Sequence, residues 1–326
     1  MSAPANSAMT SARMSRSALL RLGFLGAVWG TSFLFIKVAL EGLSPLQVAL
    51  GRTLAGAVVV WLIVAVRRLP VPRDRSLWGR VAVLSLVANV IPFYAFGWAG
   101  ERISSGVSGV YNATTPLMTL VIAILFLPEE RPSRERVYGL LLGFLGVVVV
   151  LGPWRGSDQA NLITGQLAAL GAAVSYGVGF NLTRKKLSGT GISPVVLAAC
   201  QLTASAVILG VITPLASREP MTLTPRVVLS MLALGALGTG IAFVLYHGLI
   251  RDIGATSASM VTFLIPLVAV ALGVAVLDEP LGWNLFVGGA VVIVAVALAE
   301  GRLRPRPLVP ESARAATTDA VPVPPR

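Results

Sequence analysis

Residues 103–129, ISSGVSGVYNATTPLMTLVIAILFLPE, recur without a gap as residues 253–279, IGATSASMVTFLIPLVAVALGVAVLDE. Each copy has a small, polar first half and a wholly apolar second half, with a proline between them. These prolines, Pro116 and Pro266, fall at the same position of the two copies. An internal repeat of this length indicates that two related half-proteins are fused in one chain.

The composition around this repeat is that of a membrane protein. Hydrophobic residues make up 55% of the chain and charged residues 12%, whereas a soluble domain has about 25% charged residues. Apolar runs recur along the whole length, and a run of about 18 residues can span about 30 Å of hydrocarbon as a helix. The sequence therefore predicts an all-α integral membrane protein whose surroundings are the lipid bilayer.

Ten apolar segments predict ten transmembrane helices, five in each half of the chain: 19–40, 44–66, 78–99, 103–127, 135–152, 163–185, 192–215, 226–249, 253–277 and 281–300. The chain then divides into a cytoplasmic tail (1–18), a first repeat (19–152), a polar linker (153–164), a second repeat (165–300) and an Arg/Pro-rich tail (301–326). The composition of the last segment is typical of a disordered tail in water.

The positive charges predict how the chain lies in the membrane. If the N-terminus is cytoplasmic, 20 of the 26 Lys and Arg residues fall on the cytoplasmic side and 4 outside, with Lys37 and Arg52 left inside spans. This excess predicts that both termini are cytoplasmic, in the plasma (inner) membrane. Because five spans per half is an odd number, the second repeat is expected to be inverted relative to the first. The net charge of +12 belongs to these loops, so no nucleic-acid partner is expected.

The first half also carries motifs of a known family. The stretch WGTSFLFIKVALEGLSPLQVALGRTLAG at Trp29–Gly56, the acidic step at 128–130 and the glycine-patterned segment at 139–146 resemble an EamA domain of the drug/metabolite transporter superfamily. The second half repeats the pattern over residues 165–299. The resemblance implies ten helices in two inverted five-helix repeats around a central cavity, and export of small metabolites, often amino acids. Its motifs are diffuse, so they do not identify the substrate.

The two prolines and one arginine are the candidate functional residues with the clearest physical argument. Each proline removes an amide donor in mid-span, which suits either a gate beside a polar cavity or a packed kink. Arg52 lies about eight residues into its span, where a charge costs at least about 2.5 kcal/mol, so it is expected to face the interior. No acid lies at its depth, and an unpaired guanidinium in a cavity suits a carboxylate or phosphate. The alternative for Arg52 is a structural role, through snorkelling or bonds to carbonyl groups.

Further polar and aromatic residues are expected to line the same cavity. Gln201 matches Arg52 across the repeat, and the remaining candidates are Tyr111, Asn112, Thr115, Trp29, Asn89 and Thr262. Several such residues also fit an aromatic belt at the membrane interface. His247, the single histidine, is a candidate proton relay, with a structural role as the alternative. Lys37, closer to the outer end of its span, is typical of an interfacial anchor.

These features favour a secondary transporter for a small amino-acid-like or carboxylated metabolite, exported by alternating access. A drug or other-metabolite permease of the same superfamily and a non-transporting scaffold or channel are the alternatives. An enzyme is not expected, because one histidine and the single Cys200 are too few for a metal or Cys/His site. No nucleotide-binding loop occurs, and no cofactor is expected. The oligomeric state stays open, with a homodimer as one alternative.

Overall fold

The computed structural model describes residues 15–126, 134–151, 160–187, 191–253 and 261–299. Throughout these ranges the regular structure is helical and contains no strand, so the predicted all-α class is confirmed for them. Residues 1–14 of the first predicted tail, the whole of the last one and most of the predicted linker lie outside the described residues, and residues 16–18 already belong to the first helix. The end of that linker differs from the prediction, because residues 160–164 already belong to a helix.

Helix starts in the first half follow local capping signals. Ser44 caps the second helix: its hydroxyl accepts from the Gln47 amide, the Gln47 side chain accepts from the Ser44 amide, and Pro45 occupies the first turn. The helices of this half are α1 (Arg16–Ala39), α2 (Pro45–Val66), α3 (Arg75–Ser85), the π-helix η1 (Leu86–Val90), α4 (Ile91–Gly100), α5 (Ser105–Ala113), α6 (Thr115–Phe126) and α7 (Arg134–Leu151).

The second half repeats this order of elements. It contains α8 (Ala160–Leu187), α9 (Pro194–Ala216), α10 (Pro225–Leu232), the π-helix η4 (Ala233–Ile241), α11 (Ala242–Ile253), α13 (Val261–Leu277) and α14 (Trp283–Ala299). In both halves a π-helical segment interrupts the third predicted span. Such segments widen the helix by one residue per turn and are frequent at functional sites.

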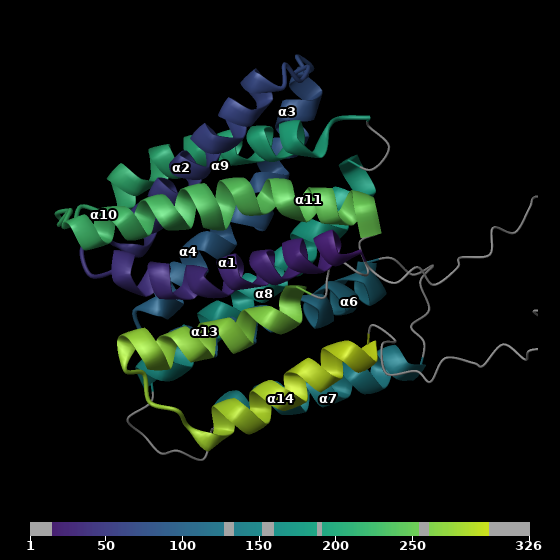
Figure 1. The fold of residues 1–326 in the computed structure, drawn as a ribbon, viewed down its shortest axis with the longest axis vertical. Coiled ribbons are helices and arrows are strands. Elements are labelled where there is room, and N and C mark those ends of the chain that lie inside the picture. Colours follow the sequence, from purple (N-terminus) through teal and green to yellow (C-terminus); the bar gives the residue numbers. More distant parts are fainter. Residues whose placement is uncertain (1–14, 127–133, 152–159, 188–190, 254–260, 300–326) are drawn as a thin grey trace, which may run out of the picture.

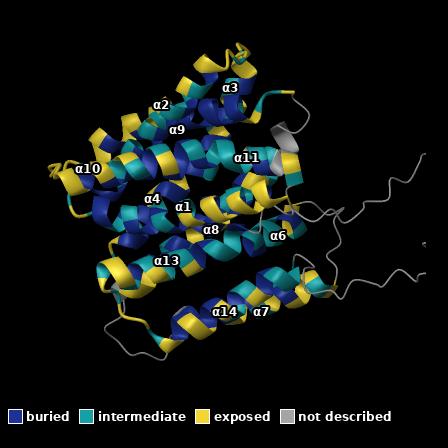
Figure 2. Cartoon of the chain, in the orientation of Figure 1, coloured by how far each residue is buried: buried dark blue, intermediate teal, exposed yellow. Residues whose placement is uncertain are grey.

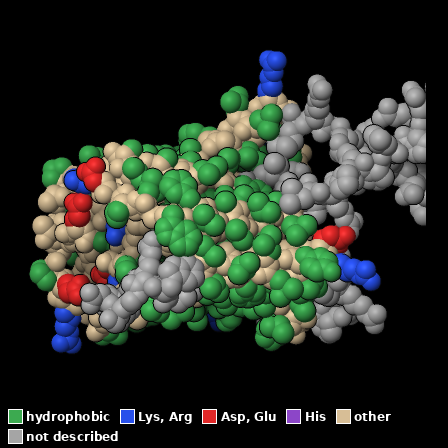
Figure 3. All heavy atoms as spheres, turned by 90° about the horizontal axis from the view of Figure 1, so that it is seen from below, with side chains coloured by type: hydrophobic (Ala, Val, Ile, Leu, Met, Phe, Trp, Pro, Cys, Tyr) green, Lys and Arg blue, Asp and Glu red, His purple; other side chains and the backbone are tan. Residues whose placement is uncertain are grey.

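The outer surface of the bundle is suited to lipid. Within the described ranges, seven helical segments are long and apolar enough to cross a membrane, and α13 and α14 are shorter apolar helices. Figure 3 shows a broad band of hydrophobic side chains on one face, with acidic and basic residues gathered towards the two ends. The protein is thus a multi-pass membrane protein, while the number of ten spans stays a prediction.

The packing of the helices respects the internal repeat. In Figure 1, α14 lies beside α7, α2 lies beside α9, and α1 lies between α13 and the α10–η4–α11 segment. The first two pairs join equivalent helices of the two halves, and the α1–α13 contact has its counterpart in the contact of α8 with α6. Buried residues face these contacts, and exposed residues face outward (Figure 2).

The two matched prolines lie in different local structures. The predicted span 103–127 is divided: α5 ends at Ala113, Thr114 caps it, and Pro116 is the second residue of α6. Pro266, in contrast, lies inside the continuous helix α13. Residues 254–260, which match the start of α5, lie outside the described residues.

Candidate functional site

Arg52 of α2 is buried at the crossing of α2 with the π-helix η4, with a relative exposure of 7%. Its Nε and Nη2 donate to the Thr239 hydroxyl at 3.4 and 3.3 Å. Thr239 in turn donates to the Leu234 carbonyl, five residues earlier, which fixes the direction of its lone pairs. The guanidinium also lies over the Phe93 ring, 3.9 Å from its centroid, an attractive cation–π arrangement.

The charge of Arg52 is not neutralised by the described part of the chain. The ion pairs there involve other cations, and the Nη1 group has no hydrogen-bond acceptor among the described residues. A guanidinium has five N–H donors in a planar fork. The sequence-based expectation that Arg52 faces the interior is therefore met, and its unused edge has the geometry that binds a carboxylate.

Gln201 occupies the equivalent place on α9, where this helix crosses η1. The main-chain carbonyl of Gln201 accepts from the Ser85 and Ser205 hydroxyls at 3.0 and 2.8 Å. Asn89 of η1 donates to the Ser205 hydroxyl at 3.1 Å. All of these groups are buried. An offset of 150 residues relates Asn89 to Thr239, so each crossing brings a polar residue of a π-helix against the neighbouring helix.

The backbones approach closely at the arginine crossing. A Cβ atom on Gly56 would lie 2.8 Å from the Thr239 methyl group and 3.2 Å from the Gly235 carbonyl. One on Gly235 would lie 3.0 Å from the Arg52 carbonyl. Gly235 stands where the first half has Ser85, whose hydroxyl binds the Gln201 carbonyl. Small residues of this kind let membrane helices pack backbone to backbone.

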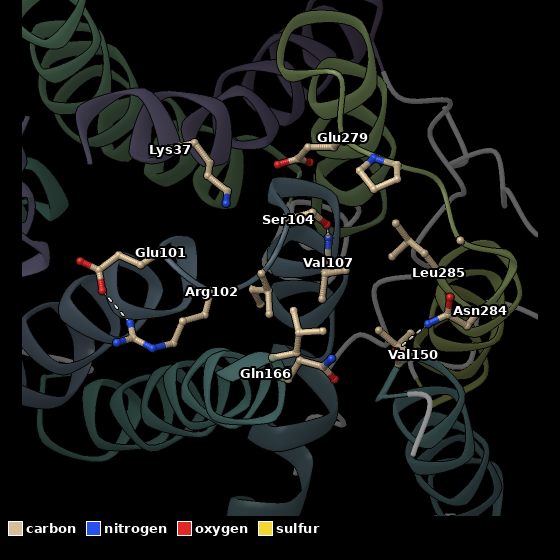
Figure 4. Close-up of a pocket in the computed structure, with 14 residues that line it drawn as sticks. Lys37, Glu101, Arg102, Ser104, Val107, Val150, Gln166, Glu279, Asn284 and Leu285 are labelled. Atoms are coloured by element: carbon tan, nitrogen blue, oxygen red, sulfur yellow. Dashed lines mark hydrogen bonds and ion pairs between the residues drawn. The ribbon is translucent and has the colours of Figure 1, made fainter. Parts of the chain in front are cut away.

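A second candidate region is a cavity of about 390 Å³ at the end of the bundle where α1, α4 and α13 finish and α5 begins. Figure 4 shows residues of several helices around it, with the Arg102 side chain turned to Glu101 and the Asn284 side chain turned to Val150. Its lining includes four charged residues: Lys37, Glu101, Arg102 and Glu279. The charge pattern of the sequence predicts that this end is the outer one, so we call this space the outer cavity.

Glu279 is held at the N-terminus of α5. Its carboxylate accepts from the Ser105 amide at 2.7 and 3.0 Å, the Ser105 hydroxyl at 2.8 Å and the Gly106 amide at 3.4 Å. These amides have no partner within the helix, and the positive end of the helix dipole favours a carboxylate there. A residue of the second repeat thereby caps a helix of the first.

The two cations of the outer cavity have different surroundings. Arg102 donates to Glu101 at 2.6 Å and to the Trp98 carbonyl at 2.9 Å, and it lies over the Trp98 ring. Lys37 is half-buried, and no hydrogen bond or ion pair within the described residues holds its ammonium group. Lys37, expected from the sequence to be an interfacial anchor, lines the cavity instead.

Aromatic residues of α1, α4 and α8 pack against one another. Phe33 is one helical turn below Lys37 on α1 and packs edge-on against Phe96 of α4, with ring centroids 5.3 Å apart. Tyr176 of α8 packs against Phe96 at 6.2 Å. In sequence, Phe96 lies between Phe93, which contacts Arg52, and Arg102, which follows α4 and lines the cavity.

The other predicted site residues are spread over the bundle. Tyr111 is buried and donates to Gln166, which lines the outer cavity. Thr115 is buried, and its hydroxyl has no hydrogen-bond partner in the part of the chain that the structure describes. Asn112 and Thr262 are partly buried on α5 and α13. Trp29 donates to the Gly238 carbonyl of η4. Trp29 therefore contacts η4 at the residue before Thr239, the partner of Arg52.

The side chain of His247 and the whole of Glu129 lie outside the described residues. Among the described residues, no group of three His, Cys, Asp or Glu side chains could hold a metal ion.

Sequence reasoning did not single out Gln166 or the capping role of Glu279. The recurrence of Glu129 as Glu279 was a usable signal, because an acid retained after both apolar halves has a shared structural place. Gln166 carried no comparable signal, since its partner Tyr111 becomes apparent only from the packing of α5 against α8.

Comparisons with known proteins agree over most of the chain. A model of the EamA-like transporter family matches residues 18–152 and 163–300, one match for each half. The uncharacterized transporter YvbV of Bacillus subtilis is 29% identical over 288 residues, covering 87% of this chain and 91% of that protein. The uncharacterized inner membrane transporter YedA of Escherichia coli K12 is 25% identical, covering 83% and 86%. A crystal structure with a TM-score of 0.64 and 21% identity covers 89% of this chain and all of its own, which supports the fold.

Proposed function

This chain belongs to the EamA-like transporter family, and on that premise we propose that it is a secondary transporter exporting a small amino-acid-like or carboxylated metabolite. The observation that carries this proposal is the Arg52 guanidinium. It is buried, its hydrogen bonds within the described residues go to one neutral hydroxyl, and Nη1 donates to no acceptor there. A buried charge in a membrane helix is a functional-site hypothesis by default, and a carboxylate matches the guanidinium in charge and shape.

The route past Arg52 is proposed to open by alternating access. Two inverted five-helix repeats would build equivalent gates that face opposite sides of the membrane. The break before Pro116 and the proline within α13 are the proposed bending points. Replacing Pro116 or Pro266 by Ala restores one amide donor and is expected to slow transport while the protein stays folded. Normal transport rates in both variants would reduce the prolines to tolerated kinks.

The orientation of the protein in the membrane is part of the proposal. With both termini cytoplasmic, Asp74 before α3 is inside and Glu219 before α10 is outside. Single cysteines at these positions, in a Cys200→Ala background, can be tested in intact cells with a membrane-impermeant maleimide. Labelling is expected at position 219 only, and labelling at position 74 would overturn the orientation.

The central experiment measures cargo affinity in liposomes for the wild type, Arg52→Ala, Arg52→Lys and Gln201→Ala, once a metabolite screen has supplied a cargo. A charge-assisted bond to a carboxylate contributes about 1.5–3 kcal/mol, so Arg52→Ala should weaken binding by about one to two powers of ten. Arg52→Lys keeps the charge without the fork and should restore only part of the affinity. Unchanged affinity in a folded Arg52→Ala protein would mean that this arginine is structural.

A further inference from the structure

We propose that the loop between α2 and α3 binds the phosphate headgroup of an anionic phospholipid. Four arginines form the site, which we call the arginine loop: Arg67, Arg68, Arg73 and Arg75. The loop lies at the tip of the α2–α3 hairpin, which projects from the bundle beside the α3 label in Figure 1 and is largely exposed in Figure 2. Such a site requires no assumption about the cargo.

The charges of the arginine loop are not neutralised within the described part of the chain. All four residues are exposed, and no hydrogen bond or ion pair there engages their side chains. Asp74 is the only acidic residue between Glu41 and Glu101. Its carboxylate caps α3 by accepting from two amides at 2.9 and 3.3 Å, and it pairs with Arg80 at 3.8 Å. Four guanidinium groups therefore remain for an external anion.

Arg68 has a backbone conformation that favours glycine. Its φ is 50°, and its amide donates to the Ala65 carbonyl at 3.1 Å. The Leu69 amide donates to the Val64 carbonyl at 3.0 Å, which completes the turn that ends α2. Glycine is the usual residue at this position of such a turn, and a larger residue there is strained.

The helix dipole does not account for an arginine at this strained position. The dipole favours a cation at the end of α2, but Arg67 at the C-cap already supplies one. A second guanidinium next to the first gives the loop two planar forks, and each fork can bind phosphate oxygens through two parallel hydrogen bonds. Phosphate binding thus gives a reason for arginine where glycine would relieve the strain.

An exposed apolar stripe leads along α2 to the same arginines. Its residues recur every four positions and therefore lie on one side of the helix: Leu54 (48% exposed), Val58 (59%), Leu62 (60%) and Val66 (82%). The stripe ends next to Arg67. An acyl chain matches the stripe and a phosphate matches the guanidinium groups beyond it. This combination favours a lipid over a soluble anion.

The loop also has a residue typical of the level of lipid headgroups. Trp78 of α3 is partly buried, and its Nε1 donates to the Pro72 carbonyl at 3.2 Å, which ties the loop to the helix. Tryptophan is enriched at the interface between membrane and water. Clusters of about four to eight Lys and Arg residues beside the cytoplasmic end of a membrane helix are typical of anionic-lipid sites. The charge pattern of the sequence predicts that this end of α2 is cytoplasmic.

The test measures which lipids the full-length protein retains. The protein is reconstituted in nanodiscs of equal parts phosphatidylglycerol and phosphatidylcholine, and the lipids that stay bound after release are counted by native mass spectrometry. The wild type is expected to retain phosphatidylglycerol in preference to phosphatidylcholine. Each arginine of the loop that is replaced by Gln should lower the ratio of the two retained lipids by up to about fivefold.

Arg218→Gln is the matched control. Arg218 is also an exposed arginine just beyond a helix end, but it follows Ser217, whose hydroxyl contacts that of Ser44 at the opposite end of α2. The control removes the same charge and should leave the lipid ratio unchanged. An equal fall in Arg68→Gln and Arg218→Gln would show only attraction by the net charge, and would overturn the site.

Arg68→Gly separates lipid binding from a structural role. Glycine relieves the left-handed backbone, so the melting temperature in phosphatidylcholine should rise or stay the same. Because a ligand that binds the folded state stabilises it, phosphatidylglycerol should raise the melting temperature of the wild type, and this rise should be smaller in Arg68→Gly. An unchanged rise in Arg68→Gly would overturn the role of this guanidinium. Equal retention of both lipids by the wild type, or the same stabilisation by inorganic phosphate, would overturn the lipid site.

Discussion

At the crossing of α2 with η4 the polar contact is made by a guanidinium, and at the equivalent crossing of α9 with η1 it is made by neutral side chains. The backbones at the two places correspond: Gly235 approaches the Arg52 carbonyl where Ser85 binds the Gln201 carbonyl. At the second crossing Ser85 and Ser205 donate to the main-chain carbonyl of Gln201, and Asn89 donates to Ser205. At the first crossing a guanidinium donates twice to one neutral hydroxyl. Equivalent packing therefore holds neutral groups at one crossing and a charged group at the other.

The largest effect is expected from filling the space between the backbones at the arginine crossing. In Gly56→Val the new side chain would meet Thr239 and the Gly235 carbonyl, and overpacking of this kind destabilises by about 1–3 kcal/mol or more. Gly210→Val on α9 is the control, because Gly210 is exposed and has no neighbour within 4 Å. Thermal unfolding in detergent should show a clear fall for position 56 alone. Equal melting temperatures would mean that the α2–η4 approach is not tight.

A second, intermediate effect is expected from making the two crossings alike. Gln201→Arg introduces a charge among bonded neutral groups, which costs at least about 2.5 kcal/mol on membrane-insertion scales. Gln201→Met, of similar size and uncharged, separates the effect of charge from that of shape. If the arginine and methionine variants have the same melting temperature, the neutral crossing is as open to water or ligand as the charged one.

The smallest effects are expected within the neutral crossing itself. Asn89→Ala removes the bond to Ser205, and side-chain bonds between membrane helices contribute about 0.6 kcal/mol on average. Ser85→Ala should cost less, because the Gln201 carbonyl keeps its bond from the Ser205 hydroxyl. A double-mutant cycle of Asn89→Ala with Ser205→Ala measures the first bond directly. A coupling energy near zero would mean that this bond does not stabilise the crossing.

The burial of Arg52 could be predicted from the sequence, and its partner could not. A charge in mid-span has to face the interior because hydrocarbon excludes it, and that argument needs no structure. Thr239 as the partner depends on the register of α2 against η4, and the π-helical turns that set this register leave no clear mark in an apolar sequence. The helical segments could also be predicted, because their apolar runs are excluded from water. The break between α5 and α6 could not, because it depends on a local hydrogen bond from the Thr114 hydroxyl to the Tyr111 carbonyl at 2.6 Å.

The same distinction applies to the outer cavity. Lys37 and Glu279 were visible as charges near the outer ends of spans, but the sequence gives no distance between residues on α1 and beyond α13. Gln166 became relevant only through its bond to Tyr111. Sequence reasoning thus identified Lys37 near the outer end of its span, whereas Glu279 and Gln166 were recognised as parts of the cavity only from the structure.

The cap on α5 also has a consequence for how the protein is made. The Ser105 amide binds a carboxylate that lies 174 residues later in the chain. At a synthesis rate of about 5–20 residues per second, the ribosome needs roughly 9–35 seconds to add those residues. During that interval the newly inserted first half has a helix end without its acceptor. A first half expressed alone would keep that defect permanently, so the two repeats are expected to mature as one unit even though each has its own set of spans.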